Sequence, residues 1–426
     1  MKKLLKFSVL TIGLLLAIGF VSCNQGNNSD SAPDTVDVTI TPGDDDTGAG
    51  DEERIANGTV GDAIATVEAV KGVTNVFSAE FDGDYFLSGA IDADLITSAD
   101  LISYLQNNMP GWKTVTDDTS TFKINVQGAA CSSIVAKNKT EGASGYIYGR
   151  NFDWDKGPAL ILHTYPLDGY ESVSTCYLPF ADPTCGEPDW TFKPADKYTA
   201  ISCVYIPMDG MNEKGLYIAN LQNDTDPVMP EEGDETKTYV QTTVAIRYIL
   251  DKCATVDEAI AWLKTITMCP VYGDVVDESG NLLFTDYHFA IADNTGKSVV
   301  VEWINGELKT VDSKIVTNHS LVNDLPDFDT LPENLDRGTY NRYDSLEATG
   351  KAKNWEMTSE EIAEALSDVQ QWNSVWSAVF EPSAKRVTYY FRKADPQAGV
   401  DQTDPDAVHN AKHHPIDYAT PVVVQF

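Results

Sequence analysis

The stretch that begins at Cys131 constrains this chain more than any other. A strand-like run, Cys-Ser-Ser-Ile-Val-Ala, is followed by turn-forming residues 138–145 and by a second strand-like run, residues 146–154. Two short β-rich runs on either side of such a turn segment predict a β-hairpin. The hairpin would bring Arg150 and Asp153 back towards the Cys131 thiol. A nucleophile, a cation and a carboxylate would then share one short unit.

Small residues stand directly before the nucleophile, with Gly128 and Ala130 on its N-terminal side. They leave the Ala130–Cys131 peptide bond open to attack by the thiol. Attack on the Ala130 carbonyl would give a thioester, and its hydrolysis would free an α-amine on Cys131. Such an amine titrates near about 7.7 to 8, so near neutral pH it can act as the base for its own thiol. A cysteine in mid-chain has no such base.

Arg150 would favour the thiolate, and Asp153 would orient the freed amine and accept one of its protons. Alternation along an ideal strand places positions 150 and 153 on opposite faces, so we expect a bulge or a strand end between them. Taken alone, the same residues also fit a buried structural thiol beside a plain ion pair. Motifs elsewhere in the chain favour the catalytic interpretation.

The motifs Cys-x-Ser-Ile-Val-Ala and Gly-Arg-Asn-x-Asp-Trp resemble those of the choloylglycine hydrolase superfamily of N-terminal-nucleophile (Ntn) cysteine hydrolases. This superfamily includes bile-salt hydrolases, penicillin V acylases, and the acid ceramidase and N-acylethanolamine amidase branch. The likeness runs from about Cys131 to about Lys393 and implies a four-layer αββα sandwich. Periodicity alone predicts only an α+β fold with antiparallel sheets.

A segment after residue 208 extends the resemblance. Asn212-Glu-Lys-Gly-Leu216 is similar to the Asn-Glu-x-Gly-Leu motif of bile-salt hydrolases, which carry a residue lining the oxyanion hole ten positions after that asparagine. The matching residue is Gln222, where bile-salt hydrolases typically have asparagine and penicillin V acylases tyrosine. Gln222 could still donate an amide N–H, but the difference leaves the subfamily open. For Asn212 itself we expect a tight turn between strands.

Two further motifs follow. Val316-Thr-Asn-His319 matches the family's Thr-Asn position, which implies that Asn318 supplies a side-chain oxyanion donor; a turn asparagine is the alternative. The pattern gives His319 no role as a base, because the α-amine already fills it. Residues 338–343, Gly-Thr-Tyr-Asn-Arg-Tyr, resemble the family's Ser-Arg-Phe segment and place Arg342 near the active site; a solvated helix arginine is the alternative.

The N-terminus is typical of an exported protein. Lysines at the start of residues 1–23 precede an apolar run that is too short for a spanning helix. Phe20-Val-Ser-Cys23 resembles a bacterial lipobox, in which Cys23 is acylated, while an ordinary cleaved signal is the alternative. Residues 24–54 are too polar and acidic to bury a core and predict a disordered tether. We therefore expect an exported lipoprotein of the bacterial cell envelope, either in the outer membrane or facing the periplasm.

Residues 55–130 predict a small α+β unit, either an accessory domain or a prosegment that covers Cys131 until the chain is cut. Residues 60–70 have helical periodicity, residues 76–87 resemble two strands, and residues 101–105 mark a short helix. The catalytic domain would span residues 131–426. Within it we expect helices over 239–250 and 255–266, a hairpin over 289–302, and capping boxes at Thr255 and Thr358.

The net charge of −35 argues against nucleic acid or an anionic membrane surface as a partner, so contact with the membrane would be through the N-terminal lipid only. No cysteine pair has zinc-ribbon spacing, and we expect no metal and no cofactor. Of the remaining cysteines, Cys176 and Cys185 could close a small loop in an oxidising compartment. A homo-oligomer is left open.

The residues and the resemblance together predict a hydrolase of linear amide C–N bonds in acylated small molecules. Conjugated bile salts are the leading substrates, and N-acylethanolamines or penicillin V are the alternatives within the class. A non-catalytic envelope lipoprotein that binds an acyl ligand is the alternative outside it. A papain-like protease is not supported, because no histidine is placed in a Cys-His arrangement.

Overall fold

The computed structural model of the chain describes residues 36–38, 64–95, 98–108, 130–154, 156–181, 202–223, 237–269, 271–276, 282–285, 287–304, 306–323 and 338–426. Cys23 and Cys185 lie outside these residues, as does most of the predicted tether. Cys176 is a free, buried thiol. In the part of the chain that is described, no helix is long and apolar enough to cross a membrane.

One β-sheet, called here the first sheet, carries the hairpin that begins at Cys131. Its strands are β1 (Val36–Val38), β4 (Ala130–Asn138), β5 (Tyr146–Asp153), β17 (Ile315–Val316), β18 (Glu356–Met357), β19 (Ser374–Glu381), β20 (Arg386–Phe391) and β21 (Val422–Gln425). Among the described residues they run in the order β1-β21-β20-β19-β5-β4-β17, and β18 also pairs with β4. The β4–β5 pair is antiparallel, which confirms the predicted hairpin.

The second sheet lies against the first. Its strands are β2 (Ile64–Ala69), β3 (Val76–Asp82), β6 (Ala159–Tyr165), β7 (Ser172–Tyr177), β8 (Asp209–Asn212), β9 (Tyr217–Gln222), β14 (Tyr287–Ala292), β15 (Ser298–Ile304) and β16 (Glu307–Asp312). In the described ranges they run in the order β16-β15-β14-β9-β8-β7-β6-β3-β2. The β14–β15 pair confirms the hairpin predicted over residues 289–302.

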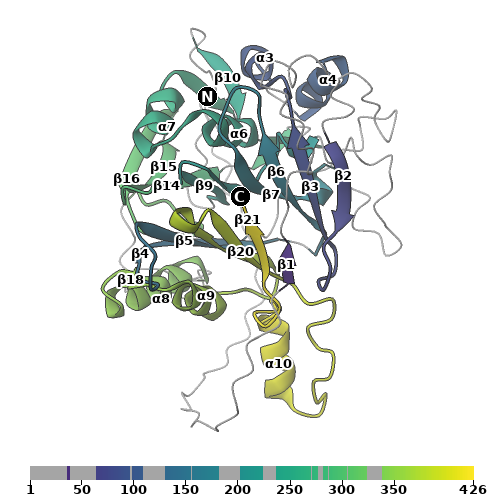
Figure 1. The fold of residues 1–426 in the computed structure, drawn as a ribbon, viewed down its shortest axis with the longest axis vertical. Helices are drawn as coiled ribbons and strands as arrows, with labels where there is room; N and C mark the ends of the chain where they lie inside the picture. Colours follow the sequence, from purple (N-terminus) through teal and green to yellow (C-terminus); the bar gives the residue numbers. More distant parts are fainter. Residues whose placement is uncertain are drawn as a thin grey trace, which may run out of the picture.

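Helices cover the outer face of each sheet, so the layers follow the order helix, sheet, sheet, helix. The helices α8 (Gly338–Ala352) and α9 (Ser359–Asp368) pack on the first sheet, while α6 (Thr242–Lys252) packs on β8 and β9 of the second. The helix α7 (Val256–Leu263) lies beside α6, and Figure 1 shows both on the opposite side of the molecule from α8 and α9. The predicted αββα sandwich is therefore confirmed.

Smaller elements complete the described fold. The helix α3 (Leu87–Asp92) packs on α6 and α4 (Ser98–Asn108) follows it in the chain, while α10 (Pro405–His413) projects from the far end of the molecule (Figure 1). The strands β10 (Thr238–Gln241) and β11 (Ile266–Cys269) form one short pair, and β12 (Val271–Val276) and β13 (Leu282–Thr285) form another.

Alternation along β4 and β5 gives the hairpin two different buried faces. Cys131 and Val135 of β4 belong to the apolar cluster between the two sheets. Ile134 and Ala136, at the intervening positions, belong to the cluster beneath α8 and α9. Each fully buried aliphatic side chain contributes roughly 1.5–3 kcal/mol, so register slippage by one residue would exchange the two faces at high cost. This fixes the thiol between the sheets.

The prediction of a helix over residues 60–70 is wrong, because residues 64–69 form β2. The register of β2 against β3 shifts between Ile64 and Val67, so three residues of β2 lie opposite two of β3. An extra residue in a bulge places positions three apart on one face of a strand. The apolar residues of this strand are therefore three positions apart, a spacing that also occurs in helices.

The prediction of two strands over residues 76–87 is also wrong. Only β3 forms, and it pairs in parallel with β6 instead of returning as a hairpin. The chain then turns at Asp84, whose Oδ1 accepts a 2.6 Å hydrogen bond from the Phe86 amide, and enters α3. The helix expected over residues 101–105 is confirmed as part of α4. The segment before the nucleophile thus extends the second sheet, and the short strand β1 joins part of the predicted tether to β21.

The predicted helices of the catalytic region differ only at their ends. The helix expected from Tyr239 begins at Thr242, since residues 238–241 form β10. Thr255 caps α7 by accepting from the Glu258 amide, but the Glu258 carboxylate accepts from the Ala254 amide, so only half of the capping box matches the prediction. The capping box of Thr358 at the start of α9 is complete.

Candidate active site

The hairpin register positions Cys131, the predicted nucleophile. Cys131 lies opposite Phe152 in the β4–β5 ladder, Ser133 lies opposite Arg150, and Ala130 lies opposite Asp153. The Cys131 side chain is buried, with 2% of its surface exposed. Arg150 shares the inward face with Cys131, whereas Asp153 is the last residue of β5. The expectation of a bulge or strand end between these two positions is wrong, because the β4–β5 ladder is regular from Arg150 through Asp153; the register shift nearby lies on β19, between Ser374 and Trp376.

A buried arginine faces the thiol. Arg150 Nη2 lies 3.8 Å from Cys131 Sγ, and Arg150 Nε donates a 2.8 Å hydrogen bond to Asp209 Oδ2 on the second sheet. The same carboxylate oxygen accepts from Trp376 Nε1 at 3.0 Å. Asp209 thus fixes the guanidinium from across the gap between the sheets. The sequence interpretation gave Asp209 no role, although its position between the apolar residues Met208 and Met211 was a signal that it is buried.

Burial raises the pKa of the Cys131 thiol above its ordinary value, because a thiolate loses its hydration between the sheets. Arg150 is the largest influence in the opposite direction, and Arg342 also lowers this pKa. The expected effect of Arg150 is thus found, but burial exceeds it in the uncut chain. A base close to the sulfur is still needed for the thiol to ionise near neutral pH.

Asp153 is the last residue of β5, and no arginine forms an ion pair with it in the part of the chain that the structure describes. Its Oδ1 accepts a hydrogen bond from the Ser374 hydroxyl, and its Oδ2 has no hydrogen-bond partner among the described residues. Burial raises the pKa of this carboxyl to about 6, although Arg342, Ser374 and Arg150 act to lower it. Asp153 therefore changes charge just below neutral pH, beside the bond that is predicted to be cut.

Asn318 lies opposite Cys131 because β17 runs antiparallel to β4, with Val316 paired to Ser133. Asn318 Oδ1 accepts from the Cys131 amide at 2.6 Å and from Arg342 Nη2 at 2.9 Å, while Asn318 Nδ2 donates to the Gln222 carbonyl at 2.6 Å. Two donors on one side and a carbonyl on the other determine the orientation of the side-chain amide. Asn318 thus holds the nitrogen of the Ala130–Cys131 peptide bond.

The structure brings Asn318 to the nucleophile as predicted, but the contact it makes there is through its oxygen. We expected its amide N–H to be an oxyanion donor. One of the two hydrogens on Nδ2 is used by Gln222, and the second remains the candidate donor.

Arg342 contacts the nucleophile from α8. Its Nη1 donates to the Cys131 carbonyl and, at 2.9 Å, to the Ser132 hydroxyl. Arg342 is buried, so the alternative of a solvated helix arginine does not hold. Arg342 Nη2 also donates to Asn318 Oδ1, so the Arg342 guanidinium links Cys131 to Asn318.

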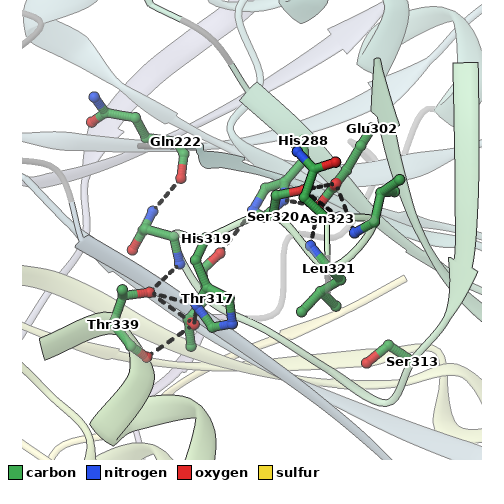
Figure 2. Close-up of polar contacts among 12 residues, drawn as sticks. Gln222, His288, Glu302, Ser313, Thr317, His319, Ser320, Leu321, Asn323 and Thr339 are labelled. Atoms are coloured by element: carbon green, nitrogen blue, oxygen red, sulfur yellow. Dashed lines mark hydrogen bonds and ion pairs between the residues drawn. The ribbon is translucent and has the colours of Figure 1, made fainter. Parts of the chain in front are cut away.

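Gln222, at the end of β9, reaches the site through its main chain. Its carbonyl accepts from Asn318, and Figure 2 shows its side-chain amide directed away from that contact. Tyr217 on the same strand shares a 3.0 Å hydrogen bond with Ser133, so its side chain points towards β4. Side chains alternate along a strand, and the Gln222 side chain therefore belongs to the other face of β9. The side-chain role expected for Gln222 stays a prediction.

The neighbouring polar residues agree with structural roles. Asn212 Oδ1 accepts from the amides of Lys214 and Leu216 at 3.1 Å, which confirms the predicted tight turn. Burial lowers the pKa of His319 to about 4, and His288 and Arg342 act in the same direction, so the imidazole is neutral at neutral pH. Its Nδ1 contacts the hydroxyls of Thr317 and Thr339. In the described residues, no three His, Cys, Asp or Glu side chains gather as metal ligands would.

Comparison with known proteins gives consistent relatives. The family model for linear amide C–N hydrolases of the choloylglycine hydrolase family matches residues 131–359. A bile salt hydrolase/transferase of Clostridium perfringens is 30% identical over 138 residues, which are 32% of this chain and 39% of the relative. A penicillin V acylase of Pectobacterium atrosepticum is 31% identical over 122 residues, 28% of this chain and 31% of the relative. The chain thus spans less than half the length of either curated relative.

Among solved structures, a mutant of the conjugated bile acid hydrolase from Clostridium perfringens has 18% sequence identity and a TM-score of 0.44, covering 61% of this chain and 89% of that one. The family model begins at Cys131, the residue that the hairpin, Arg150 and Asn318 surround, and it matches more than half of the chain. This protein therefore belongs to the choloylglycine hydrolase family of linear amide C–N hydrolases.

Proposed function

We propose that this protein is a self-processing cysteine hydrolase that cleaves the linear amide bond of an acylated small molecule. The observation that carries the proposal is the hydrogen bond from the Cys131 amide to Asn318 Oδ1, in a site where Arg150 faces the sulfur. A structural cysteine would gain nothing from a buried arginine at its sulfur and a second arginine at its carbonyl. Membership of the family supports the reaction class.

The first reaction is the cleavage of the chain itself. Cys131 Sγ attacks the Ala130 carbonyl carbon, the C–N bond to Cys131 breaks as its nitrogen takes up a proton, and a thioester forms. Water then hydrolyses the thioester, giving a carboxylate on Ala130, a free thiol and an α-amine on Cys131. Asn318 Oδ1 would keep the amine near the sulfur, because it already accepts from that nitrogen in the uncut chain. Asp153, paired with Ala130 in the ladder, lies at the leaving side.

The second reaction uses the same groups on a substrate. The α-amine takes the thiol proton, the thiolate attacks the substrate's amide carbonyl, and the resulting ammonium returns the proton to the leaving nitrogen. The second N–H of Asn318 would stabilise the oxyanion, a contribution that is typically worth about 10² to 10³ in rate. Water hydrolyses the acyl thioester and releases the acid. Asp153, as a carboxylate, would orient the ammonium form of the amine.

Conjugated bile salts are the proposed substrates, with N-acylethanolamines or penicillin V as alternatives. The names of the two curated relatives, a bile salt hydrolase/transferase and a penicillin V acylase, support bile salts and penicillin V, while N-acylethanolamines rest on the resemblance of the motifs alone. We further propose that the protein is exported and held at the cell envelope by a lipid on Cys23, with no nucleic-acid partner. The lipobox-like residues 20–23 and the acidic composition support these two points.

The test is the intact mass and N-terminal sequence of purified wild-type protein beside Cys131→Ala. We expect two fragments with a new N-terminus at Cys131 in the wild type and one uncut chain in the variant. Cys176→Ala, which removes another buried thiol, is the matched control and should still be cut. The processed protein is then assayed with glycocholate, phenoxymethylpenicillin and an N-acylethanolamine. An uncut wild type that hydrolyses none of them would instead favour a non-catalytic acyl-binding lipoprotein.

A further inference from the structure

A buried acid–base pair lies behind the loop that carries Asn318. His288 on β14 and Glu302 on β15 are in contact through Nδ1 and Oε1, at 3.1 Å, and both side chains are inaccessible to solvent. Neither residue belongs to the predicted catalytic set. Figure 2 shows the pair on one side of the loop, with Thr317 and His319 between it and Thr339.

Glu302 holds the C-terminal half of this loop. Its Oε1 accepts from the Leu321 amide at 2.8 Å, and its Oε2 accepts from the Ser320 hydroxyl at 2.6 Å and from the Val322 amide at 3.2 Å (Figure 2). Burial acts to raise the pKa of Glu302, but His288 and these donors lower it below its ordinary value. The carboxylate is therefore charged, and it is the common acceptor for residues 320–322.

His288 holds the N-terminal half of the loop. Its Nε2 lies 2.7 Å from the Thr317 carbonyl, on the opposite side of the ring from Glu302. The ring therefore lies between the Glu302 carboxylate and the Thr317 carbonyl and contacts both. His288 thus contacts the residue immediately before Asn318, and Glu302 contacts residues 320–322 after it.

The main chain of the loop is also held at Asn318 itself. Asn318 N donates to Thr339 Oγ1 at 2.8 Å, which supports the loop from the side of α8. Together these contacts leave the Asn318 side chain as the part of the loop that projects to Cys131. A buried charged carboxylate such as that of Glu302 gives less stability than an apolar side chain of similar size would, so its position behind the loop that carries Asn318 suggests a role other than stability.

We propose that His288 and Glu302 are a positioning pair for the reaction, acting through Asn318 on the nitrogen of Cys131. The inference rests on the proposed function for its consequence in catalysis, but the positioning itself is a property of the uncut chain. Loss of the pair would let residues 317–322 shift and lengthen the contact between Asn318 Oδ1 and the Cys131 nitrogen. A misplacement of about 1 Å can cost roughly 10²-fold in rate.

Glu302→Gln tests the proposal because it keeps the size of the side chain and removes the charge and one acceptor. The matched control is Glu381→Gln at the opposite end of β19 from Ser374. Glu381 is another buried carboxylate that accepts from a serine hydroxyl, that of Ser359, and from a basic side chain, that of Arg386. Ser320→Ala removes a single donor to Glu302 and provides a milder variant should Glu302→Gln fold poorly.

The first measurement is hydrogen–deuterium exchange at the residue-131 amide, resolved to single residues, in the uncuttable Cys131→Ala protein. We expect Glu302→Gln to raise the exchange rate of this amide about tenfold or more and Ser320→Ala to raise it less, while Glu381→Gln leaves it unchanged. Unchanged exchange at residue 131 in both Glu302→Gln and Ser320→Ala would overturn the proposal. This readout needs neither cleavage nor a substrate.

The second measurement is the rate at which the Cys131 N-terminus appears in chains that keep the thiol. We expect Glu302→Gln to slow it roughly 10- to 100-fold. In an Asn318→Ala background the same change should add little, because both act through one residue. Effects that simply multiply would show that Glu302 stabilises the fold without positioning Asn318. A wild-type chain that is never cut would contradict the proposed function, and the exchange result would still decide the positioning role.

Discussion

Two buried arginine–aspartate pairs in this protein have the same chemistry and different neighbours. Arg150 and Asp209 are 2.8 Å apart, and Arg247 and Asp251 on α6 are 2.6 Å apart, with all four side chains inaccessible to solvent. A third group contacts each pair, and its identity differs between the two. At Arg150 it is the Cys131 sulfur, 3.8 Å from Nη2. At Asp251 it is the hydroxyl of Tyr85, which comes from the segment before the nucleophile.

The difference shows that a buried pair is not by itself a sign of catalysis. The Arg150 pair connects the two sheets and directs positive charge at a group that can ionise. The Arg247 pair lies within one helix and is completed by Ser172, at 2.5 Å from Arg247 Nη2, and by Tyr85. We therefore expect the first pair to control reactivity and the second to hold the N-terminal segment to the catalytic region.

The largest effect should come from Arg150→Gln. Arg150 lowers the pKa of the Cys131 thiol, so its loss raises this pKa further and the thiolate fraction at pH 7 should fall roughly tenfold or more. The rate at which iodoacetamide alkylates Cys131, followed by mass spectrometry of the Cys131 peptide, measures this fraction. Arg247→Gln is the control and should leave the alkylation rate of the folded protein unchanged.

Stability and reactivity can be separated within the first pair. Arg150→Gln leaves Asp209 charged and buried, at a cost of about 3–5 kcal/mol in the free energy of unfolding. Combining it with Asp209→Asn removes that buried charge and should restore much of the stability without restoring alkylation. A double variant that recovers both would show that Arg150 acts only by keeping the protein folded.

An intermediate effect is expected at Asp153, a buried carboxyl without an arginine partner of the kind that Asp209 and Asp251 have. Its pKa is raised to about 6, so the folded chain binds this proton more tightly than the unfolded chain does. The unfolded state then binds fewer protons between about pH 4 and 6, and stability falls as the pH rises through that window. In the uncuttable Cys131→Ala chain, Asp153→Asn should therefore raise the free energy of unfolding at pH 8 by up to about 3 kcal/mol.

Urea unfolding at pH 4 and pH 8 measures this change, which should nearly vanish at the lower pH. The same substitution in the chain that keeps Cys131 should slow self-cleavage at pH 8 and remove any limb of its pH profile near 6. The uncut chain has no α-amine at Cys131, so that limb reports on Asp153. An equal stability gain at both pH values would contradict the assigned protonation.

The smallest effect should come from Tyr85→Phe, which removes the hydroxyl from the second pair. A buried hydrogen bond to a charged group contributes about 1.5–3 kcal/mol, so the cleaved N-terminal fragment should dissociate at a lower urea concentration. Size-exclusion chromatography of the cut protein in increasing urea follows the fragment. Tyr104→Phe is the control, because the Tyr104 hydroxyl donates to the Phe86 carbonyl within the same segment. Equal retention of the fragment in all three proteins would show that the Tyr85 hydroxyl contributes no measurable stability to this association, which would then depend on other contacts such as the β3–β6 and β1–β21 pairings.

The sequence predicted the parts of the site that a local motif or a family motif marks. The hairpin at Cys131 and the convergence of Arg150, Asn318 and Arg342 on it are confirmed by the geometry. The residues that hold these groups were not predicted, because Asp209 contacts Arg150 across two sheets at a separation of 59 residues. No local pattern encodes such a contact.

The N-terminal segment was predicted less well than the catalytic region. The register shift in β2 gave its apolar residues a helical spacing, and β3 found its partner in β6, which follows the nucleophile in the chain. Pairing of this kind depends on residues that lie far away in the sequence, so the periodicity of residues 60–87 could not reveal it.

If the chain cuts itself as proposed, the contacts at Cys131 would also set the time at which the peptide bond before it becomes reactive. The Cys131 amide is held by a residue 187 positions later in the chain, and its carbonyl by one 211 positions later. A ribosome delivers the N-terminal residues first, so a nascent chain that ends before Arg342 has the thiol but not the groups that orient the bond. The proposed self-cleavage would then require that synthesis has passed Arg342 and that both sheets have formed. Truncated chains would keep their N-terminal segment, which links cutting to the completion of folding.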